Sequence, residues 1–320
     1  MGSKPKRGQI TLKSGKEYSI KVEYKWEGRF PAVQIGMLAP DDHDLMDAAV
    51  ALAQKSDATI LIVGTNSDWE TEGNDRDSLQ LPLRQNELIE RVCTANKNTV
   101  VVLNTGAPCE MPWNDQVDAI LQCWFPGQEF GNSLADILFG DVNPSGKLPT
   151  TFPVKLEDTP AYSTYPGKDL QMDYQEGLYI GYRWYEKEKI VPLYPFGHGL
   201  SYTTFDYSNV RAIPPKGTSS VAAFELEITN TGSTQGKEVI QCYSSVQNSK
   251  VDRPLKELKK FQKINLDPGE SKKITFEVNE RDLSYWNEET KTWQVEPAQY
   301  VFEFGSSSSD IRGSAEVWLG

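Results

Sequence analysis

Between residues 43 and 139 the sequence alternates amphipathic segments with unbroken apolar runs, and this alternation restricts the fold more than any other feature. Apolar residues recurring every three or four positions predict amphipathic helices, here over residues 43–56, 84–95 and 131–139. Short runs without polar interruption predict buried strands, here over residues 58–64, 99–103 and 119–124. Strands that are apolar on both faces and alternate with helices are typical of a parallel sheet covered on both sides. We therefore expect a three-layer α/β sandwich with a mostly parallel sheet.

The loops that follow these strands are where a ligand is expected. Open parallel sheets bind ligands beyond the carboxyl ends of their strands. In this chain those loops begin after Gly64, Leu103 and Trp124.

The C-terminal third has a different pattern and predicts an all-β domain. Short apolar runs are separated by turn sequences such as Asn230-Thr231-Gly232 and Asp267-Pro268-Gly269. We expect strands over residues 224–228, 238–243, 273–278 and 299–304. This spacing indicates a β-sandwich of about 100 residues. The fold class is accordingly α/β plus all-β.

Two other regions are less regular. Residues 9–37 alternate in a strand-like way around a turn at Ser14-Gly15-Lys16, which predicts two or three antiparallel strands, too few to be stable alone. Residues 143–207 are rich in proline, glycine and aromatic residues and show no period. So many large side chains in a loop-rich stretch indicate a packed connector or the wall of a pocket.

Composition excludes several classes of function. A net charge of −12 and a pI near 4.8 disfavour a nucleic-acid partner. No apolar run is long enough for a membrane helix, and we expect no membrane partner. With two histidines and four cysteines at spacings that match no known motif, we expect no metal and no cofactor. The absence of a signal-like start and of a glycosylation sequon favours a cytoplasmic location. Any catalysis must rest on carboxylates.

The loop after the first parallel strand, residues 65–76, concentrates such carboxylates. Glu70 and Glu72 lie two positions apart beside Trp69, and a general acid needs a neighbourhood of this kind to stay protonated near neutral pH. We expect Arg76 to hold Asp75 and to fix the loop. The alternative is an acidic loop that only caps the next helix.

Several motifs, taken in order, resemble glycoside hydrolase family 3. The loop and the following segment read VGTNSDWETEGNDRDSLQLPLRQNELI, similar to the family's sequence around its acid/base residue. The further motifs are NTGAPCEMPW, WFPGQEFGNSLADILFGDVNPSGKLPTTFP, YQEGLYIGYRWY and PFGHGLSYTTF. Residues 211–320 resemble the family's fibronectin type III-like domain. The similarity covers roughly residues 44–320.

The resemblance implies a domain organisation. Residues 1–40 would be the tail of an incomplete protective-antigen-like β-sandwich insert, and 41–160 the α/β sandwich domain. Residues 161–210 would be an aromatic-rich connector, and 211–320 the fibronectin type III-like domain. The chain would thus be the C-terminal portion of a β-glucosidase.

The resemblance also implies residue roles. The glutamate of the family's Glu-Gly-x-Asp-Arg element is the general acid/base, which is Glu72 here, with Glu70 as the competing assignment. The family's nucleophile is an aspartate on an N-terminal barrel that precedes the region covered here. The aromatic residues of 174–185 and His198 are expected mainly to pack, although the aromatics could stack on sugar rings.

The expected reaction is hydrolysis of terminal non-reducing β-D-glucosyl residues by a retaining mechanism with two carboxylates. This chain would supply the acid/base glutamate and lack the nucleophile. The expected partners are a β-glucoside or oligosaccharide substrate and a barrel domain supplied upstream or in trans. The alternative is a non-catalytic fragment or a carbohydrate-binding or scaffold remnant.

Overall fold

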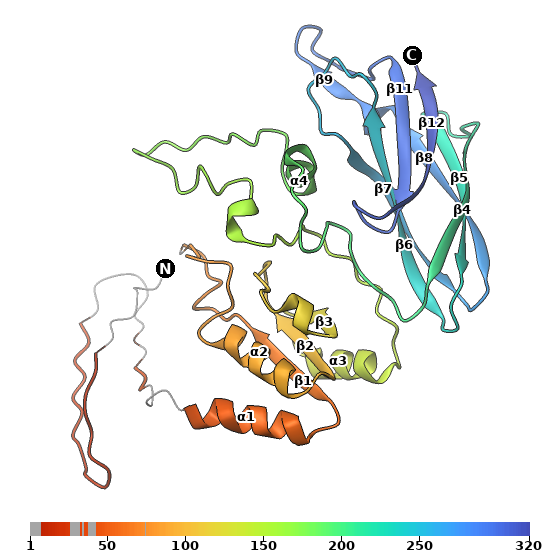
Figure 1. Ribbon diagram of the computed structural model, residues 1–320. Coiled ribbons are helices and arrows are strands. Elements are labelled where there is room, and N and C mark those ends of the chain that lie inside the picture. Colours follow the sequence, from red (N-terminus) through yellow and green to blue (C-terminus); the bar gives the residue numbers. More distant parts are fainter. Residues whose placement is uncertain (1–7, 26–32, 34, 38–42, 74) are drawn as a thin grey trace.

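The computed structural model describes residues 8–25, 33, 35–37, 43–73 and 75–320. Figure 1 shows an α/β part, coloured orange to yellow, and a β-sandwich, coloured green to blue. A long connector, residues 140–204, joins them. Both predicted classes of structure, α/β and all-β, are present in the predicted order.

The α/β part contains a parallel sheet in the order β1-β2-β3. Its elements are α1 (His43–Lys55), β1 (Thr59–Gly64), α2 (Gln85–Ala95), β2 (Thr99–Asn104), β3 (Ala119–Gln122) and α3 (Phe130–Phe139). Helix α1 packs on α2, and α2 packs on β2. The three strands and three helices predicted from periodicity are therefore confirmed, with ends that differ by one or two residues.

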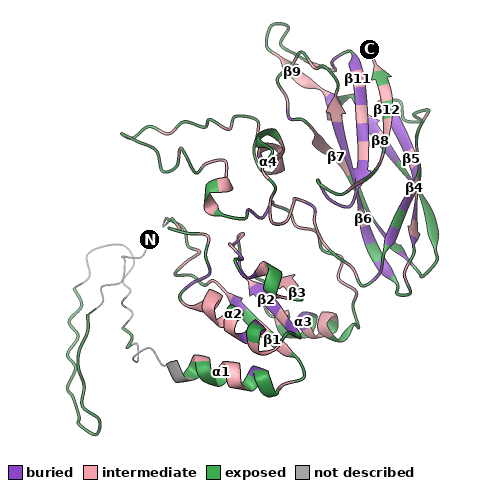
Figure 2. Ribbon diagram, in the orientation of Figure 1, coloured by how far each residue is buried: buried purple, intermediate pink, exposed green. Residues whose placement is uncertain are grey.

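The central strand β2 explains why this sheet is stable. Val101, Val102 and Leu103 are fully buried, which removes a continuous apolar strip from water. On β1, by contrast, Ile60 and Ile62 stay about half exposed, because no element of the described chain covers that side of the strand. Figure 2 shows this difference between β1 and β2.

The predicted N-terminal strands are not found among the described residues. In 8–25 the chain makes the expected turn, with a hydrogen bond from the Lys16 N–H to the Lys13 carbonyl at 3.3 Å. No strand is assigned there, and apolar side chains such as Ile10 and Ile20 are exposed. An isolated ribbon has no face to pack against and is marginal in water. Much of 26–42 lies outside the described residues.

The β-sandwich packs a four-stranded sheet, β12-β11-β6-β7, against a three-stranded sheet, β4-β5-β8. Its strands are β4 (Phe205–Ile213), β5 (Ser220–Asn230), β6 (Gly236–Val246), β7 (Glu257–Leu266), β8 (Ser271–Asn279), β11 (Ala298–Gly305) and β12 (Ile311–Leu319). A core of alternating inward residues, including Phe224, Phe302 and Phe304, fills the space between the sheets. The four strands predicted in this region are confirmed as parts of β5, β6, β8 and β11.

Short elements complete the chain. They are the 3₁₀ turns η1 (Asn114–Gln116) and η2 (Leu156–Asp158), the helices α4 (Tyr182–Glu188) and α5 (Glu280–Leu283), and the hairpin strands β9 (Tyr285–Asn287) and β10 (Thr292–Gln294). Helix α4 lies in the region that sequence analysis treated as irregular. The aromatic residues of this short helix obscure the regular spacing of apolar side chains that would have predicted it. The burial of Tyr185 stabilises the helix. Within the described residues, no helix is long and apolar enough to cross a membrane.

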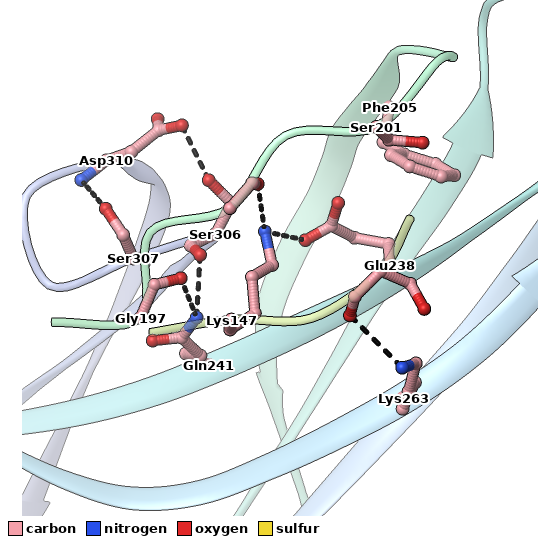
Figure 3. Close-up of polar contacts among 12 residues, drawn as sticks. Lys147, Gly197, Ser201, Phe205, Glu238, Gln241, Lys263, Ser306, Ser307 and Asp310 are labelled. Atoms are coloured by element: carbon pink, nitrogen blue, oxygen red, sulfur yellow. Dashed lines mark hydrogen bonds and ion pairs between the residues drawn. The ribbon is translucent and has the colours of Figure 1, made fainter. Parts of the chain in front are cut away.

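A buried polar cluster joins the connector to the sandwich, as Figure 3 shows. The ammonium of Lys147 lies 3.2 Å from a carboxylate oxygen of Glu238 on β6 and donates to the Gly199 carbonyl at 2.9 Å. The side chains of Lys147 and Glu238 are only 12% and 6% exposed. On the same strand, the Gln241 amide donates to the Gly197 carbonyl at 3.1 Å. Because these groups satisfy one another away from water, they define how the connector sits on the sandwich.

Candidate active site

The end of β1 is clamped to the start of α2 by one side chain. Gln85 accepts a hydrogen bond from the Gly64 N–H at 2.7 Å and donates from its amide to the Gly64 carbonyl at 2.9 Å. A side chain at Gly64 would overlap the backbone of Asn104 at the end of β2. Glycine is therefore needed where β1 ends, and the loop that follows starts from a fixed point.

A tight turn then folds the acidic loop back toward β2. The side-chain oxygen of Asn66 accepts from the Asp68 N–H at 2.9 Å. The Asn66 carbonyl accepts from the N–H groups of Trp69 and Glu70, at 3.0 and 2.9 Å. Asparagine favours such turns because its side chain can cap its own backbone two residues on. The turn carries Glu70 across to the neighbouring loop.

Glu70 links the loop after β1 to the loop after β2. Its Oε1 accepts hydrogen bonds from the Gly106 backbone N–H, at 3.0 Å, and from the Thr65 hydroxyl. A side chain at Gly106 would overlap both Glu70 Oε2 and the ring of Phe125. Glu70 is thus a hydrogen-bond acceptor packed against a backbone that must be glycine.

The loop after β3 reaches the same place. Phe125 follows β3, and its ring lies beside Gly106 at the same point that the Glu70 carboxylate reaches from the loop after β1. The Gln122 amide donates to the Thr105 carbonyl at 3.0 Å, which ties the end of β3 to the end of β2. The three strand-end loops predicted to hold the site therefore meet in the structure.

Glu72 lies in the same loop but in a different environment. It is exposed, and among the described residues no hydrogen bond or ion pair holds its carboxylate. Gly73, which follows it, has a φ of 82°, a left-handed conformation that glycine adopts without strain. The backbone thus turns sharply just after Glu72. The two candidate glutamates share the loop, with Glu70 engaged by neighbouring groups and Glu72 open to solvent.

The predicted Asp75–Arg76 pairing is wrong. The Tyr165 hydroxyl donates to Asp75, and this hydrogen bond raises the pKa of Tyr165. Arg76 instead donates through Nη1 to the Pro108 carbonyl at 3.5 Å. Its Nε and Nη2 are buried and have no partner among the described residues. The loop is fixed by contacts to distant segments, which a neighbour-based reading of the sequence could not anticipate.

The cysteine beside this loop is inert. Cys109 is fully buried, and burial raises the pKa of its thiol to about 12, with the nearby Arg76 charge opposing the shift. A thiol in this state is no nucleophile at neutral pH. In the described part of the chain no group of three or more histidine, cysteine or acidic side chains forms a metal-binding cluster.

His198 and the aromatic residues of the connector mostly pack. His198 stacks on Tyr194 with ring centroids 5.1 Å apart, and burial lowers its pKa, with Lys147 as the second cause. The Tyr182 hydroxyl accepts from the Leu258 N–H at 2.8 Å, and the Tyr179 hydroxyl donates to Asp252 at 2.6 Å. Tyr174, in contrast, is exposed.

Sequence reasoning missed three residues that shape the site: Gln85, Gly106 and Tyr165. Only Gly106 carried a signal, as a glycine three positions beyond a predicted strand end, where close approach of another group is common. The roles of the other two depend on tertiary contacts.

Comparison with known proteins identifies the family. Residues 6–202 match the model described as the glycosyl hydrolase family 3 C-terminal domain, and residues 238–308 match the fibronectin type III-like domain. The chain belongs to glycoside hydrolase family 3. The resemblance inferred from the motifs is confirmed, and so is the fold class.

Among relatives in family 3, a β-glucosidase of Kluyveromyces marxianus is 43% identical over 97% of this chain, which spans 38% of that protein. Thermostable β-glucosidase B of Acetivibrio thermocellus is 45% identical over 84% of this chain and 36% of its own length. The chain therefore spans less than two fifths of these two relatives.

Solved family 3 structures share the architecture. The K. marxianus β-glucosidase superposes with a TM-score of 0.83 at 43% identity, over 88% of this chain and 33% of that one. DesR, a β-glucosidase from Streptomyces venezuelae solved in complex with D-glucose, gives a TM-score of 0.82 at 39% identity, over 88% of this chain and 36% of its own.

Proposed function

We propose that this chain forms part of a retaining β-glucosidase and that Glu72 is its general acid/base. In such a mechanism a carboxylic acid protonates the glycosidic oxygen, and its carboxylate then activates the water that releases the glycosyl-enzyme. The partner carboxylate, about 5–5.5 Å away in retaining enzymes, would come from the barrel that family 3 members carry. The substrate would be a terminal, non-reducing β-D-glucosyl residue, in line with the names of the relatives.

The different environments of the two glutamates support this choice. Glu70 Oε1 accepts two hydrogen bonds, one from a backbone N–H and one from Thr65, and is packed against Gly106 and Phe125. A general acid needs a carboxyl that can reach the leaving-group oxygen and hand over a proton. The exposed Glu72 is free to do so once a substrate is bound. Glu70 would be a positioning residue that joins the acidic loop to the loop after β2.

Turnover of aryl β-glucosides by a barrel-containing form tests the assignment. We expect Glu72→Gln to lower kcat/KM by about 10²–10⁴-fold for a poor leaving group, and much less for an activated leaving group such as dinitrophenol that needs no protonation. Glu70→Gln should affect both substrates alike, because it disturbs the loop rather than proton transfer. The reverse pattern would assign the acid/base role to Glu70.

We also propose that the segment 160–181 contacts the nucleophile-bearing barrel. This segment is tied to the acidic loop by the Tyr165–Asp75 hydrogen bond. Its large apolar side chains are exposed at Leu170, Tyr174, Leu178 and Ile180. An apolar strip of this kind beside a candidate active site is typical of a partner surface.

Co-purification with a separately expressed family 3 barrel measures this contact. The double variant Tyr174→Asp/Leu178→Asp should lose the barrel, since two charges would be buried in the contact. Trp318→Asp is the control, because Trp318 is also exposed but lies on β12 of the sandwich. Equal retention of the barrel by both variants would contradict the proposal.

The second candidate function is a non-catalytic carbohydrate-binding remnant. It is favoured by exposed aromatic side chains such as Tyr174, which can stack on sugar rings. Calorimetric binding of glucose or cellobiose to the 320-residue chain, without hydrolysis of an aryl β-glucoside even when a barrel is supplied, would support it. Hydrolysis by the chain combined with a barrel would exclude it.

A further inference from the structure

Two tryptophans form an exposed aromatic pair on the hairpin of β9 and β10. Trp286 and Trp293 are directly opposite each other across the antiparallel ladder, so both side chains lie on the same face. Their ring centroids are 5.5 Å apart with the planes inclined at 63°. The residues remain 43% and 49% exposed. Figure 1 shows this hairpin at the end of the sandwich, well apart from β1–β3.

The hairpin holds these rings in a fixed position. The Arg281 guanidinium lies 3.3 Å from the centroid of Trp293 and covers one face of that indole. The neighbouring side chains alternate to the other face of the ladder, where the Asn287 amide donates to Gln294 at 3.0 Å. The Gln294 amide donates in turn to the Thr290 and Thr292 hydroxyls, at 3.0 and 3.2 Å. Hydrogen bonds thus hold one face of the hairpin in place, and the two indoles lie preorganised on the other face.

Stability of the hairpin alone does not account for this arrangement. Cross-strand aromatic pairs do stabilise hairpins, by about 0.2–1 kcal/mol. Two adjacent indoles nevertheless leave a contiguous apolar surface exposed, and such a surface gains most when it is covered. The Arg281 guanidinium covers one face of Trp293, whereas among the described residues no cation stacks on Trp286, which stays partly exposed.

The local charge narrows the chemistry of the ligand. The turn carries Glu288, Glu289 and Lys291, and in α5 Arg281 is flanked by Glu280 and Asp282, so the surroundings are acidic and disfavour an anionic ligand. The whole chain carries a net charge of −12, which repels polyanions. A neutral ligand with a flat apolar face suits the paired indoles. A β-linked glucosyl ring has such a face, because its hydroxyls are equatorial and its axial C–H bonds point above and below the ring.

We propose that the Trp286–Trp293 pair is an auxiliary binding platform for a neutral β-glucan chain. Successive glucosyl rings would stack on the two indoles and be held close to the enzyme without entering its active site. The choice of a β-glucan as the occupant rests on the proposed function, since a β-glucosidase acts on the ends of such chains. The platform itself is distinct from the acidic loop, which lies on the α/β part.

Native affinity electrophoresis of the 320-residue chain in gels containing mixed-linkage β-glucan tests the platform. We expect the polysaccharide to retard the wild-type chain and Trp286→Ala to weaken that retardation at least tenfold, which is about 1.4 kcal/mol. Trp318→Ala is the matched control, because Trp318 is 65% exposed on the edge strand β12 and should not matter. Dextran, an α-linked glucan, should not retard the chain.

Trp286→Thr provides a second variant in case the alanine disturbs the hairpin, since threonine favours strands. An unchanged thermal unfolding midpoint verifies that each variant is folded. Failure of β-glucan to retard the wild type, equal effects of the variants at Trp286 and Trp318, or equal retardation by dextran would each overturn the proposal. Retardation measures binding and does not depend on hydrolysis. The platform can therefore be tested even if the chain has no glucosidase activity, which separates this proposal from the proposed function.

Discussion

Glu70 Oε1 accepts a hydrogen bond from the Gly106 backbone N–H at 3.0 Å, a contact that joins the loops after β1 and β2. The contact exists only because position 106 has no side chain. It fixes where the acidic loop runs, with Glu70 held against β2's loop and Glu72 exposed.

Gly106→Ala should destabilise the protein and displace the acidic loop. The added methyl group would overlap Glu70 and Phe125, and overpacking of this kind costs about 1–3 kcal/mol. Urea unfolding measures the loss. Gly131→Ala is the control, because Gly131 lies in α3 with open space around it, and alanine there should leave stability unchanged or raise it. Equal stability of the two variants would contradict the packing described here.

Lys147→Met should be strongly destabilising. The substitution leaves the Glu238 carboxylate buried without its cation, which costs about 3–5 kcal/mol. The double variant Lys147→Met/Glu238→Gln should recover part of the loss, because no buried charge is then left alone. Arg211→Met, which breaks an exposed pair with Glu225 on the same domain, should change the unfolding free energy little. A similar effect of Lys147→Met and Arg211→Met would show that the cluster in Figure 3 does not hold the connector.

Stability should fall as the pH drops below about 6.5 because of His198. Burial lowers its pKa below the usual 6.5, so in this window the unfolded chain binds more protons than the folded one. The free energy of unfolding therefore decreases with falling pH until the folded-state pKa is passed, where the effect levels off. Chemical denaturation at several pH values between about 5 and 7.5 measures how steeply the free energy of unfolding depends on pH. His198→Gln should reduce the slope of the unfolding free energy against pH, whatever its effect on stability at a single pH. An unchanged slope would show that His198 does not cause the pH dependence.

Thiol labelling should separate the four cysteines. Cys93, Cys109 and Cys242 are buried, and burial raises the pKa of each thiol. Cys123 is only half-buried and should react first with a disulfide reagent at pH 8, although its pKa is also raised. Cys123→Ser should abolish the rapid phase of labelling in the folded protein. Rapid labelling of Cys109 would indicate that the loops around the site open in solution.

The sequence predicted the layout of the fold because layout follows from local patterns. An apolar run such as 99–103 can be stable only inside a sheet, and amphipathic segments must cover it. The meeting of the three strand-end loops followed from the same rule. Periodicity alone did not reveal α4, because the helix has only 7 residues and several of them are aromatic.

The site was predictable only to the level of its loop. The sequence pointed to residues 65–76 and to Glu72 and Glu70, but the partners of those residues are distant. Asp75 is bonded to Tyr165, 90 residues away, so pairing it with its neighbour Arg76 was wrong. The role of Glu72, the domain boundaries and the cytoplasmic location stay predictions.

Azide rescue is the most direct measurement of the central claim. In a barrel-containing form, Glu72→Ala should stall at the glycosyl-enzyme, because no carboxylate activates the water that would release it. Added azide should then restore turnover of an activated aryl β-glucoside and yield β-glucosyl azide, while Glu70→Ala should yield none. Formation of β-glucosyl azide by Glu70→Ala and not by Glu72→Ala would contradict the account.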